Sequence, residues 1–261
     1  MMENMKKIEF IGKSQHIAII GYGRFGNLLE KIISLVNPEI PIKIYSLSEN
    51  PDNIKFFPLE KVVKNAGLII PAVPINKFES ACQAVAPYIQ LGATVVEVCS
   101  VMEHPVKVMK DVFKNKPDVN LVASHPMFGP AAWKRGGENL SALQRLKIVI
   151  NNVRCPKEKY QQIITFLRQL GLNIFELEPE EHDKLMANSQ FFVQLVRQIA
   201  ADLGLDKTAV DTPAAAKIFE GIELMGSSRE LFLDMITFNR FAKELLLQIN
   251  YTLNELVKSL N

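Results

Sequence analysis

Residues 124–130, SHPMFGP, place one titratable imidazole between an apolar run and a turn rich in proline and glycine. The apolar residues 120–123 read as a buried strand, so we predict that His125 lies where this strand ends. The prolines restrict the backbone around the imidazole. In an open α/β sheet, ligands bind in the crevice outside the carboxyl ends of the strands. His125 is therefore placed for chemistry, although a histidine that only caps a strand end has the same signature.

A glycine-rich turn follows the first apolar strand of the chain. Residues 16–20 are rich in β-branched side chains, residues 21–26 read GYGRFG, and residues 27–33 have the apolar spacing of a helix. Strand, G-x-G-x-x-G and helix, in this order, indicate a dinucleotide fold. We expect the backbone and side chains of this turn to bind the cofactor, whose phosphates face the helix N-terminus. The turn consists of Gly21, Tyr22, Gly23, Arg24, Phe25 and Gly26.

The second strand bears on the choice of cofactor. Residues 42–45 form this strand, and an NAD-specific site usually has a carboxylate just after it. Here Ser46 and Ser48 follow, and Glu49 comes three residues too late. These two serines and Arg24 could hydrogen-bond a 2′-phosphate, so we expect NADP in preference to NAD.

Further strands alternate with helices. Residues 66–74 form an apolar strand that ends in prolines, and we expect Val73 and Pro74 to lie in a loop over the cofactor. Residues 93–100 form the next strand, and residues 77–88 have helical spacing between the two. This alternation predicts a parallel, doubly wound α/β sheet of the Rossmann type. Ser100 then lies at the carboxyl end of a strand, where it either takes part in the chemistry or caps the next helix.

The hydrophobic pattern of the sequence changes near Glu178. Strands at 146–150 and 173–177 flank a helix at 160–170, and only helical periods follow. We therefore predict a dinucleotide-binding domain over residues 1–178 and an all-helical substrate and dimerisation domain over residues 179–261.

The first helix of the second domain carries a polar stripe through a mostly apolar surface, so we expect it to be buried nearly all round. The stripe lies on one face and faces either the cofactor cleft or a subunit interface. Its residues are Asp183, Gln190, Gln194 and Arg197. His182 and Asp183 support the site or only cap the helix.

The last helix is expected to run from residue 230 to about residue 260 with a wide apolar stripe. A chain of this size cannot easily cover such a helix alone. We therefore expect a homodimer built through the C-terminal helices.

Composition and charge limit the partners, metal sites and compartment that we expect for this protein. The 261 residues are 48% hydrophobic with a net charge of +2, which gives no indication of nucleic acid or an anionic membrane as partner. Three widely spaced cysteines imply neither a disulfide framework nor a metal site. We find no signal peptide and no apolar run long enough for a membrane span, so a cytoplasmic protein is expected.

Four segments together resemble the prephenate/arogenate dehydrogenases of tyrosine biosynthesis, with the arogenate dehydrogenases of plant type the most similar. They are GYGRFG at 21–26, EVCSV at 97–101, SHPMFGP at 124–130 and HDKLMANSQF at 182–191. The resemblance covers almost the whole chain. It implies an NAD(P)-dependent oxidative decarboxylation of a cyclohexadienol ring, with hydride leaving C4 as carbon dioxide departs and the ring becomes aromatic. The product is tyrosine or 4-hydroxyphenylpyruvate, and no appended chorismate mutase or regulatory domain is expected.

The same resemblance implies roles for single residues. His125 would accept a hydrogen bond from the 4-hydroxyl and take its proton, and Ser100 would bond the same oxygen or orient the imidazole. Lys134 would neutralise the ring carboxylate, or is only an exposed lysine. Gln190 and Gln194 would contact the substrate, and Gln194 stands where relatives often have a histidine, which puts a proton relay there in doubt.

One departure bears on the substrate. Our alignment puts Glu223 where many prephenate-using relatives carry an arginine, and a carboxylate suits the ammonium group of arogenate. Arogenate is therefore the expected substrate, although Arg229 lies nearby in the sequence. Two other classes share the pattern of domains: a β-hydroxyacid dehydrogenase or imine reductase, with Lys184 as the acid, and a non-catalytic NAD(P)-sensing protein.

Overall fold

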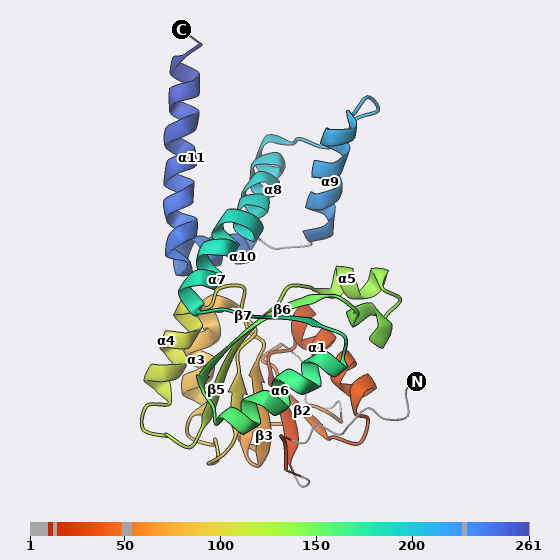
Figure 1. The fold of residues 1–261 in the computed structure, drawn as a ribbon, viewed down its shortest axis with the longest axis vertical. Helices are drawn as coiled ribbons and strands as arrows, with labels where there is room; N and C mark the ends of the chain where they lie inside the picture. Colours follow the sequence, from red (N-terminus) through yellow and green to blue (C-terminus); the bar gives the residue numbers. More distant parts are fainter. Residues whose placement is uncertain (1–9, 13–14, 49–53, 226–228, 261) are drawn as a thin grey trace. The chain divides into compact units, whose positions relative to one another are not determined.

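The structure, a computed structural model, describes residues 10–12, 15–48, 54–225 and 229–260 (Figure 1). The chain is divided into two compact units, a first unit of Met1–Glu178 and a second unit of Pro179–Asn261. Within the described ranges, no helix is both long and apolar enough to cross a membrane.

The described part of the first unit contains a seven-stranded sheet in the order β2-β1-β3-β4-β5-β6-β7 (Figure 1). Its strands are β1 (His16–Ile20), β2 (Ile42–Tyr45), β3 (Ala66–Pro71), β4 (Thr94–Val96), β5 (Asn120–Pro126), β6 (Lys147–Arg154) and β7 (Asn173–Glu176). Every residue of β1, β3 and β5 is buried, as expected for strands covered on both faces.

The parallel arrangement holds for β1 to β5 and is wrong for the last two strands. β6 pairs with β5 in antiparallel orientation, and β7 is parallel to β6. The cause is the connection after β5, which contains α5 (Pro130–Arg135) and the 3₁₀ turn η1 (Leu140–Leu143). At 1.5 Å per residue a six-residue helix spans about 9 Å, which is too short to return across a sheet whose strands are ~20 Å long. The chain therefore turns back at the same edge.

Helices cover both faces of this sheet. They are α1 (Arg24–Val36), α2 (Leu59–Val63), α3 (Ile75–Val85), α4 (Glu103–Val112) and α6 (Lys157–Gln169), besides α5. α1 and α6 contribute to the same two apolar clusters. α3 and α4 pack against each other. In the sheet, β2 lies on one side of β1, and β3, β4 and β5 lie on the other side. Right-handed connections between parallel strands therefore put α1 on one face of the sheet and the pair α3 and α4 on the opposite face.

A buried histidine makes the first unit sensitive to acid. His16 in β1 is 4% exposed, and its Nε2 lies 2.7 Å from the Val62 carbonyl oxygen. Burial lowers the pKa of His16 below its ordinary 6.5. Below that pH the unfolded chain binds a proton that the folded chain does not, so stability falls as the pH falls.

We therefore expect His16→Gln, which keeps an N–H donor, to make the urea midpoint less dependent on pH between about pH 7 and pH 5. The measurement is urea denaturation followed by circular dichroism at several pH values. An unchanged pH slope in the variant would show that other groups govern acid sensitivity.

The second unit is helical in its described part. Its elements are α7 (Pro179–Met186), the π-helical turn η2 (Ala187–Phe191), α8 (Phe192–Leu203), α9 (Pro213–Met225), α10 (Arg229–Phe238) and α11 (Arg240–Lys258). Gly204, in the left-handed region with φ +67°, ends α8.

The single long helix expected at the C-terminus is two helices. Asn239 separates α10 from α11, and its extended backbone interrupts the helical hydrogen bonding. The Asn239 side chain accepts hydrogen bonds from the backbone N–H groups of Phe241 and Ala242, which caps α11. Asparagine is a favoured cap because its side-chain oxygen accepts hydrogen bonds from the first N–H groups of the helix, which have no acceptor within it.

The expectation that the first helix of this unit is buried nearly all round is also wrong. Leu185, Phe192, Val193 and Ile199 are 38–47% exposed. The helices of one chain cover only one side of α7 and α8, so these apolar side chains have no cover within the described residues of the unit.

Candidate active site

The glycine-rich turn lies at the carboxyl end of β1, beside the point where the strand order reverses between β1 and β3. Gly21 has φ +97°, and a Cβ atom there would lie 2.5 Å from the Ala72 carbonyl oxygen. A Cβ atom on Gly26 would lie 2.3 Å from the Gly21 carbonyl oxygen. The packing of the protein itself thus requires glycine at both positions, and the turn fits closely against the end of β3.

Gly23 differs from these two glycines. Its φ of −69° is open to any residue, and a Cβ atom there would meet no atom of the described structure within 4 Å. The fold therefore gives no reason for glycine at this position. Gly23 precedes the first turn of α1, whose N–H groups attract anions. The open space at Gly23 fits the close approach of a pyrophosphate to the backbone.

Tyr22 belongs to a polar cluster that sequence reasoning missed. Its ring packs edge-on against Phe56, and its hydroxyl accepts a hydrogen bond from Asn27 Nδ2 at 2.8 Å. The buried Glu30 of α1 pairs with Lys55 and lies within 3.4 Å of the Tyr22 hydroxyl. The sequence feature that could have indicated this cluster is Glu30, an acid on the inward face of the amphipathic helix α1.

The remaining cofactor candidates lie at the ends of neighbouring strands. The Oγ atoms of Ser46 and Ser48 are 3.1 Å apart just after β2. Val73 and Pro74 connect β3 to α3, and Arg24 is the exposed first residue of α1. Phe25 is half-buried and packs against the cluster that includes Trp133. Glu49 lies outside the described residues.

His125 lies one residue before the end of β5, and the strand runs further than the expected residues 120–123. Pairing with β6 extends the strand, with His125 opposite Val149. Ser124 and Pro126 line an apolar cavity of about 140 Å³ on the side of α1 and α6. Because side chains alternate along a strand, His125 points to the opposite face. Its side chain is 3% exposed.

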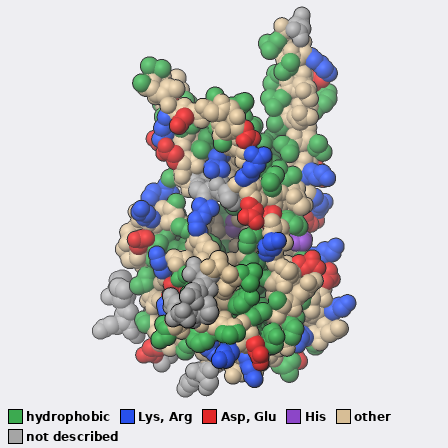
Figure 2. Space-filling model, turned by 180° about the vertical axis from the view of Figure 1, so that it is seen from behind, with side chains coloured by type: hydrophobic (Ala, Val, Ile, Leu, Met, Phe, Trp, Pro, Cys, Tyr) green, Lys and Arg blue, Asp and Glu red, His purple; other side chains and the backbone are tan. Residues whose placement is uncertain are grey.

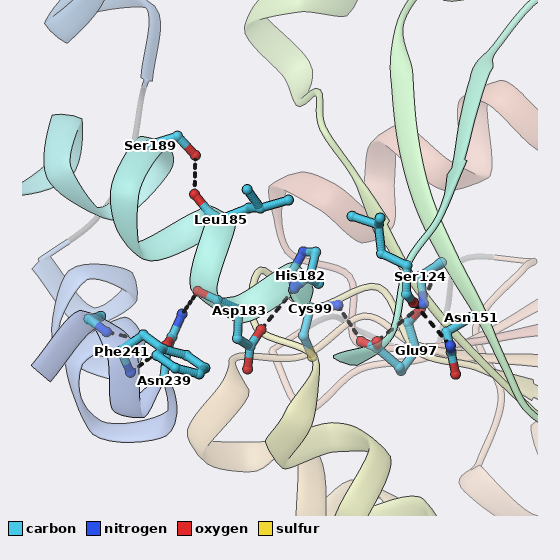
Figure 3. A network of polar contacts seen from close by, with 12 residues as sticks. Glu97, Cys99, Ser124, Asn151, His182, Asp183, Leu185, Ser189, Asn239 and Phe241 are labelled. Carbon is cyan, nitrogen blue, oxygen red and sulfur yellow. Dashed lines mark hydrogen bonds and ion pairs between the residues drawn. The ribbon is translucent and has the colours of Figure 1, made fainter. Parts of the chain in front are cut away.

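Ser100 is not a helix cap. β4 ends at Val96, four residues earlier, so Ser100 lies in the following loop rather than at the end of a strand. The cap residue of α4 is Met102, which makes no side-chain capping bond. The expected strand 93–100 is shorter because the Glu97 carboxylate accepts a hydrogen bond from the backbone N–H of Cys99, and such local bonds compete with the sheet (Figure 3).

A buried polar pair lies at the start of the second unit. Nδ1 of His182 is 2.8 Å from Oδ1 of Asp183, and both side chains have no exposed surface. Asn239 Nδ2 donates to the Asp183 carbonyl oxygen at 2.8 Å, which ties α7 to the start of α11 (Figure 3). Asp183 lies beyond the first turn of α7, so the capping interpretation is wrong for it.

The predicted substrate-binding residues of the second unit are spread over three helical segments, η2, α8 and α9. Gln190 lies in the π-helical turn, a feature often found at functional sites, and its Oε1 is buried without a hydrogen-bond partner in the described structure. Gln194 is 2% exposed. Glu223 lines a cavity of about 170 Å³ with Arg197, between α8 and α9, and pairs with Lys207 at 2.8 Å.

In the first unit, Lys134 is exposed in the last turn of α5. Among the residues that the structure describes, no three His, Cys, Asp or Glu side chains form a cluster that could hold a metal ion.

The chain is similar to prephenate and arogenate dehydrogenases. Residues 54–176 match the nucleotide-binding domain of prephenate dehydrogenase. Arogenate dehydrogenase 1, chloroplastic, of Arabidopsis thaliana is 26% identical over 89% of this chain and 37% of its own length. A probable arogenate/prephenate dehydrogenase of Methanocaldococcus jannaschii is 28% identical over 71% of this chain and 42% of its own length. The chain thus spans well under half of either relative.

Solved structures agree on the fold. A prephenate dehydrogenase from A. aeolicus, in complex with hydroxyphenyl propionate and NAD⁺, has a TM-score of 0.70 at 16% identity and covers 95% of this chain and 91% of its own. The Synechocystis arogenate dehydrogenase has a TM-score of 0.67 at 18% identity, with 94% and 91% covered. Residues 54–176 are thus similar in sequence to the nucleotide-binding domain of prephenate dehydrogenase, and the chain has the fold of these solved dehydrogenases.

Proposed function

We propose that this protein is an NAD(P)-dependent dehydrogenase that oxidatively decarboxylates a cyclohexadienol, with arogenate preferred to prephenate and NADP preferred to NAD. One observation carries the proposal. β1, β4 and β5 are parallel, so the glycine-rich turn, the loop with Ser100 and the end of β5 with His125 all lie at one edge of one sheet. That edge is where ligands bind in open α/β sheets.

The cofactor would lie on the glycine-rich turn and supply the acceptor for the hydride. Gly23 and the N-terminus of α1 would hold its phosphates, and Ser46, Ser48 and Arg24 would contact the ribose phosphate. Val73 and Pro74 would form the loop over it. The fit rests on the open space at Gly23, which no atom of the described chain fills.

Two residues of the chain act on the ring hydroxyl of the substrate and its proton. His125 accepts a hydrogen bond from the ring hydroxyl and takes its proton as carbonyl character develops, which is the general-base role that imidazole side chains most often have. Ser100 bonds the same oxygen or orients the imidazole. Because aromatisation favours the loss of carbon dioxide, the protein contributes chiefly alignment.

Polar side chains of the second unit bind the rest of the substrate. Gln190 offers an acceptor that has no partner among the described residues, and Gln194 can hydrogen-bond but not titrate. Glu223 binds the ammonium group of arogenate, and its pairing with the Lys207 ammonium supports this preference for a cation. Lys134 neutralises the ring carboxylate, while His182 and Asp183 fix the first helix of the unit.

The direct test is turnover with each pairing of arogenate or prephenate with NADP or NAD, followed by the absorbance of the reduced nicotinamide. Tyrosine or 4-hydroxyphenylpyruvate is identified by chromatography. Turnover with arogenate and NADP at the highest kcat/KM is expected. Nucleotide binding without turnover on either substrate would favour a sensing protein, and turnover only with β-hydroxyacids or imines would favour the other classes.

The proposed role of Glu223 predicts a substrate-selective effect. Glu223→Gln should raise the KM for arogenate roughly tenfold, the value of one charge-assisted hydrogen bond, and leave the KM for prephenate unchanged. Steady-state kinetics with both substrates measure this. Glu220→Gln, at an exposed position of the same helix, is the matched control and should change neither. An equal rise with both substrates would contradict the assignment.

A homodimer through α11 is the proposed assembly. Leu253, Leu256, Val257 and Leu260 are 51–83% exposed and lie three or four residues apart, so they form one apolar stripe. Figure 2 shows apolar side chains exposed along this helix, among interspersed acidic and basic ones. Exposed apolar patches of this kind mark interaction sites.

Light scattering should therefore give the mass of a dimer for the parent and of a monomer for the double variant Leu253→Glu and Val257→Glu. Leu247→Glu is the control, because Leu247 is 61% exposed on another face of α11. A monomeric parent, or dissociation by the control variant, would contradict this interface.

We also place the protein in the cytoplasm. The support is its free cysteines: Cys82 and Cys99 are buried and Cys155 is half-buried. Free thiols are typical of a reducing compartment.

A further inference from the structure

Glu97 is a fully buried acid just beyond the end of β4. Its Oε2 accepts a hydrogen bond from the Cys99 backbone N–H at 2.7 Å, and its Oε1 accepts one from the Ser124 backbone N–H at 3.2 Å (Figure 3). A carboxylate out of water requires such donors, because burying an unpaired charge is costly. One side chain therefore joins the loop after β4 to strand β5.

Each of the two N–H donors belongs to the residue directly before a proposed site residue. Cys99 directly precedes Ser100, and Ser124 directly precedes His125. Ser124 also bonds to the main chain of Glu97: its N–H donates to the Glu97 carbonyl oxygen at 3.1 Å, and its Oγ donates to the same oxygen at 2.7 Å. These bonds hold only the β5 side of the contact. The N–H of Cys99 lies in the loop beyond β4. There it donates to the Glu97 carboxylate in place of a neighbouring strand.

Activation of the neighbouring thiol is a different role that Glu97 could have. Burial, followed by the charge of Glu97, raises the pKa of Cys99 well above its ordinary value. The thiol therefore stays protonated, and a thiolate is the form that reacts. The contacts of Glu97 are thus better explained by the backbone that it holds than by chemistry at Cys99.

We propose that Glu97 is a positioning residue, whose carboxylate sets the placement of Ser100 relative to His125. This inference rests on the proposed function. Two groups that act on one substrate oxygen must be held in register, since a misplacement of about 1 Å can cost roughly 100-fold in rate. Because Glu97 is anchored to the backbone preceding each group, a change in its carboxylate shifts both groups without touching the glycine-rich turn.

The first test is Glu97→Gln, which keeps the shape but replaces one acceptor oxygen by an NH₂ group facing an N–H donor. We expect kcat for arogenate to fall roughly 10- to 100-fold, with KM and nucleotide affinity changed less than about threefold. Thr94→Val is the matched control, because Thr94 is fully buried in β4, three residues before Glu97, and its hydroxyl has no partner in the described structure. It should keep the parent kcat. A parent-like kcat in Glu97→Gln would overturn the proposal.

A double variant separates positioning from general damage. If Glu97 acts through His125, adding Glu97→Gln to His125→Asn should lower the single-turnover rate little further. If Glu97 only supports the fold, the two losses should multiply, and that result would also overturn the proposal.

Hydrogen exchange tests the contact itself without any substrate. In Glu97→Gln, the backbone amides of Cys99 and Ser124 should lose protection, while those of β1 keep theirs. Unchanged protection would refute the role of the carboxylate even if the parent had no activity on either substrate. An inactive parent with reduced protection in the variant would instead leave the contact standing and refute the proposed function.

Discussion

His125→Asn is expected to lower kcat roughly 100- to 10,000-fold, the usual contribution of a general base, while nucleotide affinity stays at the parent value. Asparagine is close in size to the inner part of the imidazole and can still hydrogen-bond, but it cannot take a proton. His125 is buried within β5, which β3 and β4 separate from β1 and the glycine-rich turn that follows it. The substitution should therefore affect the chemical step and leave the binding of cofactor intact.

Steady-state kinetics and nucleotide fluorescence titration measure the two quantities. The control is His104→Gln, a substitution of another histidine of the first unit, in α4, which should keep the parent kcat. The pH profile adds a second criterion: the acidic limb of kcat/KM that the parent shows should be absent in His125→Asn. Turnover near the parent value would mean that another group takes the proton.

Gly23→Val should abolish most nucleotide binding and leave the fold intact. Its backbone is extended, with φ −69° and ψ −168°, which suits valine, and a Cβ atom would meet no protein atom within 4 Å. The added methyl groups would instead occupy the space proposed for the pyrophosphate. We expect the Kd for NADP to rise at least about 100-fold, or ~2.7 kcal/mol, with an unchanged melting temperature.

Gly26→Ala provides the contrast, because its Cβ would lie 2.3 Å from the Gly21 carbonyl oxygen. This variant should lose thermal stability as well as nucleotide affinity. Gly221→Ala, an open position in α9, should lose neither. Titration calorimetry and thermal denaturation distinguish the three. If Gly23→Val bound NADP as the parent does, the cofactor would have to lie elsewhere.

Much of the sheet could be predicted because its strands are short apolar runs with sharp ends. β1 and β2 have the expected bounds, since buried β-branched residues stop at glycine or serine on one side. β4 could not be bounded in this way. Glu97 lies in an apolar run that reads as one strand to Ser100, but its carboxylate accepts hydrogen bonds from the N–H of Cys99, two residues on, and from that of Ser124 in β5. The bond to Ser124, 27 residues away, leaves no local pattern in the sequence.

The second unit shows a similar limit. A period of apolar residues continues through Asn239, so the sequence reads as one helix, whereas Asn239 caps a new one and binds the Asp183 carbonyl oxygen. The π-helical turn at 187–191 likewise adds a residue to one turn without any change in composition. In the candidate site, the residue types of the glycine-rich turn, Ser100 and His125 were readable. The burial of His125 and the open space at Gly23 required the fold.

The reversal at β6 has a consequence for how a protein of this fold can change. Because the segment between β5 and β6 never leaves the ligand edge of the sheet, it can lengthen, shorten or exchange side chains without disturbing any strand pairing. New substrate preferences could therefore arise in residues 127–146 by ordinary loop variation, while the nucleotide half of the sheet stays as it is.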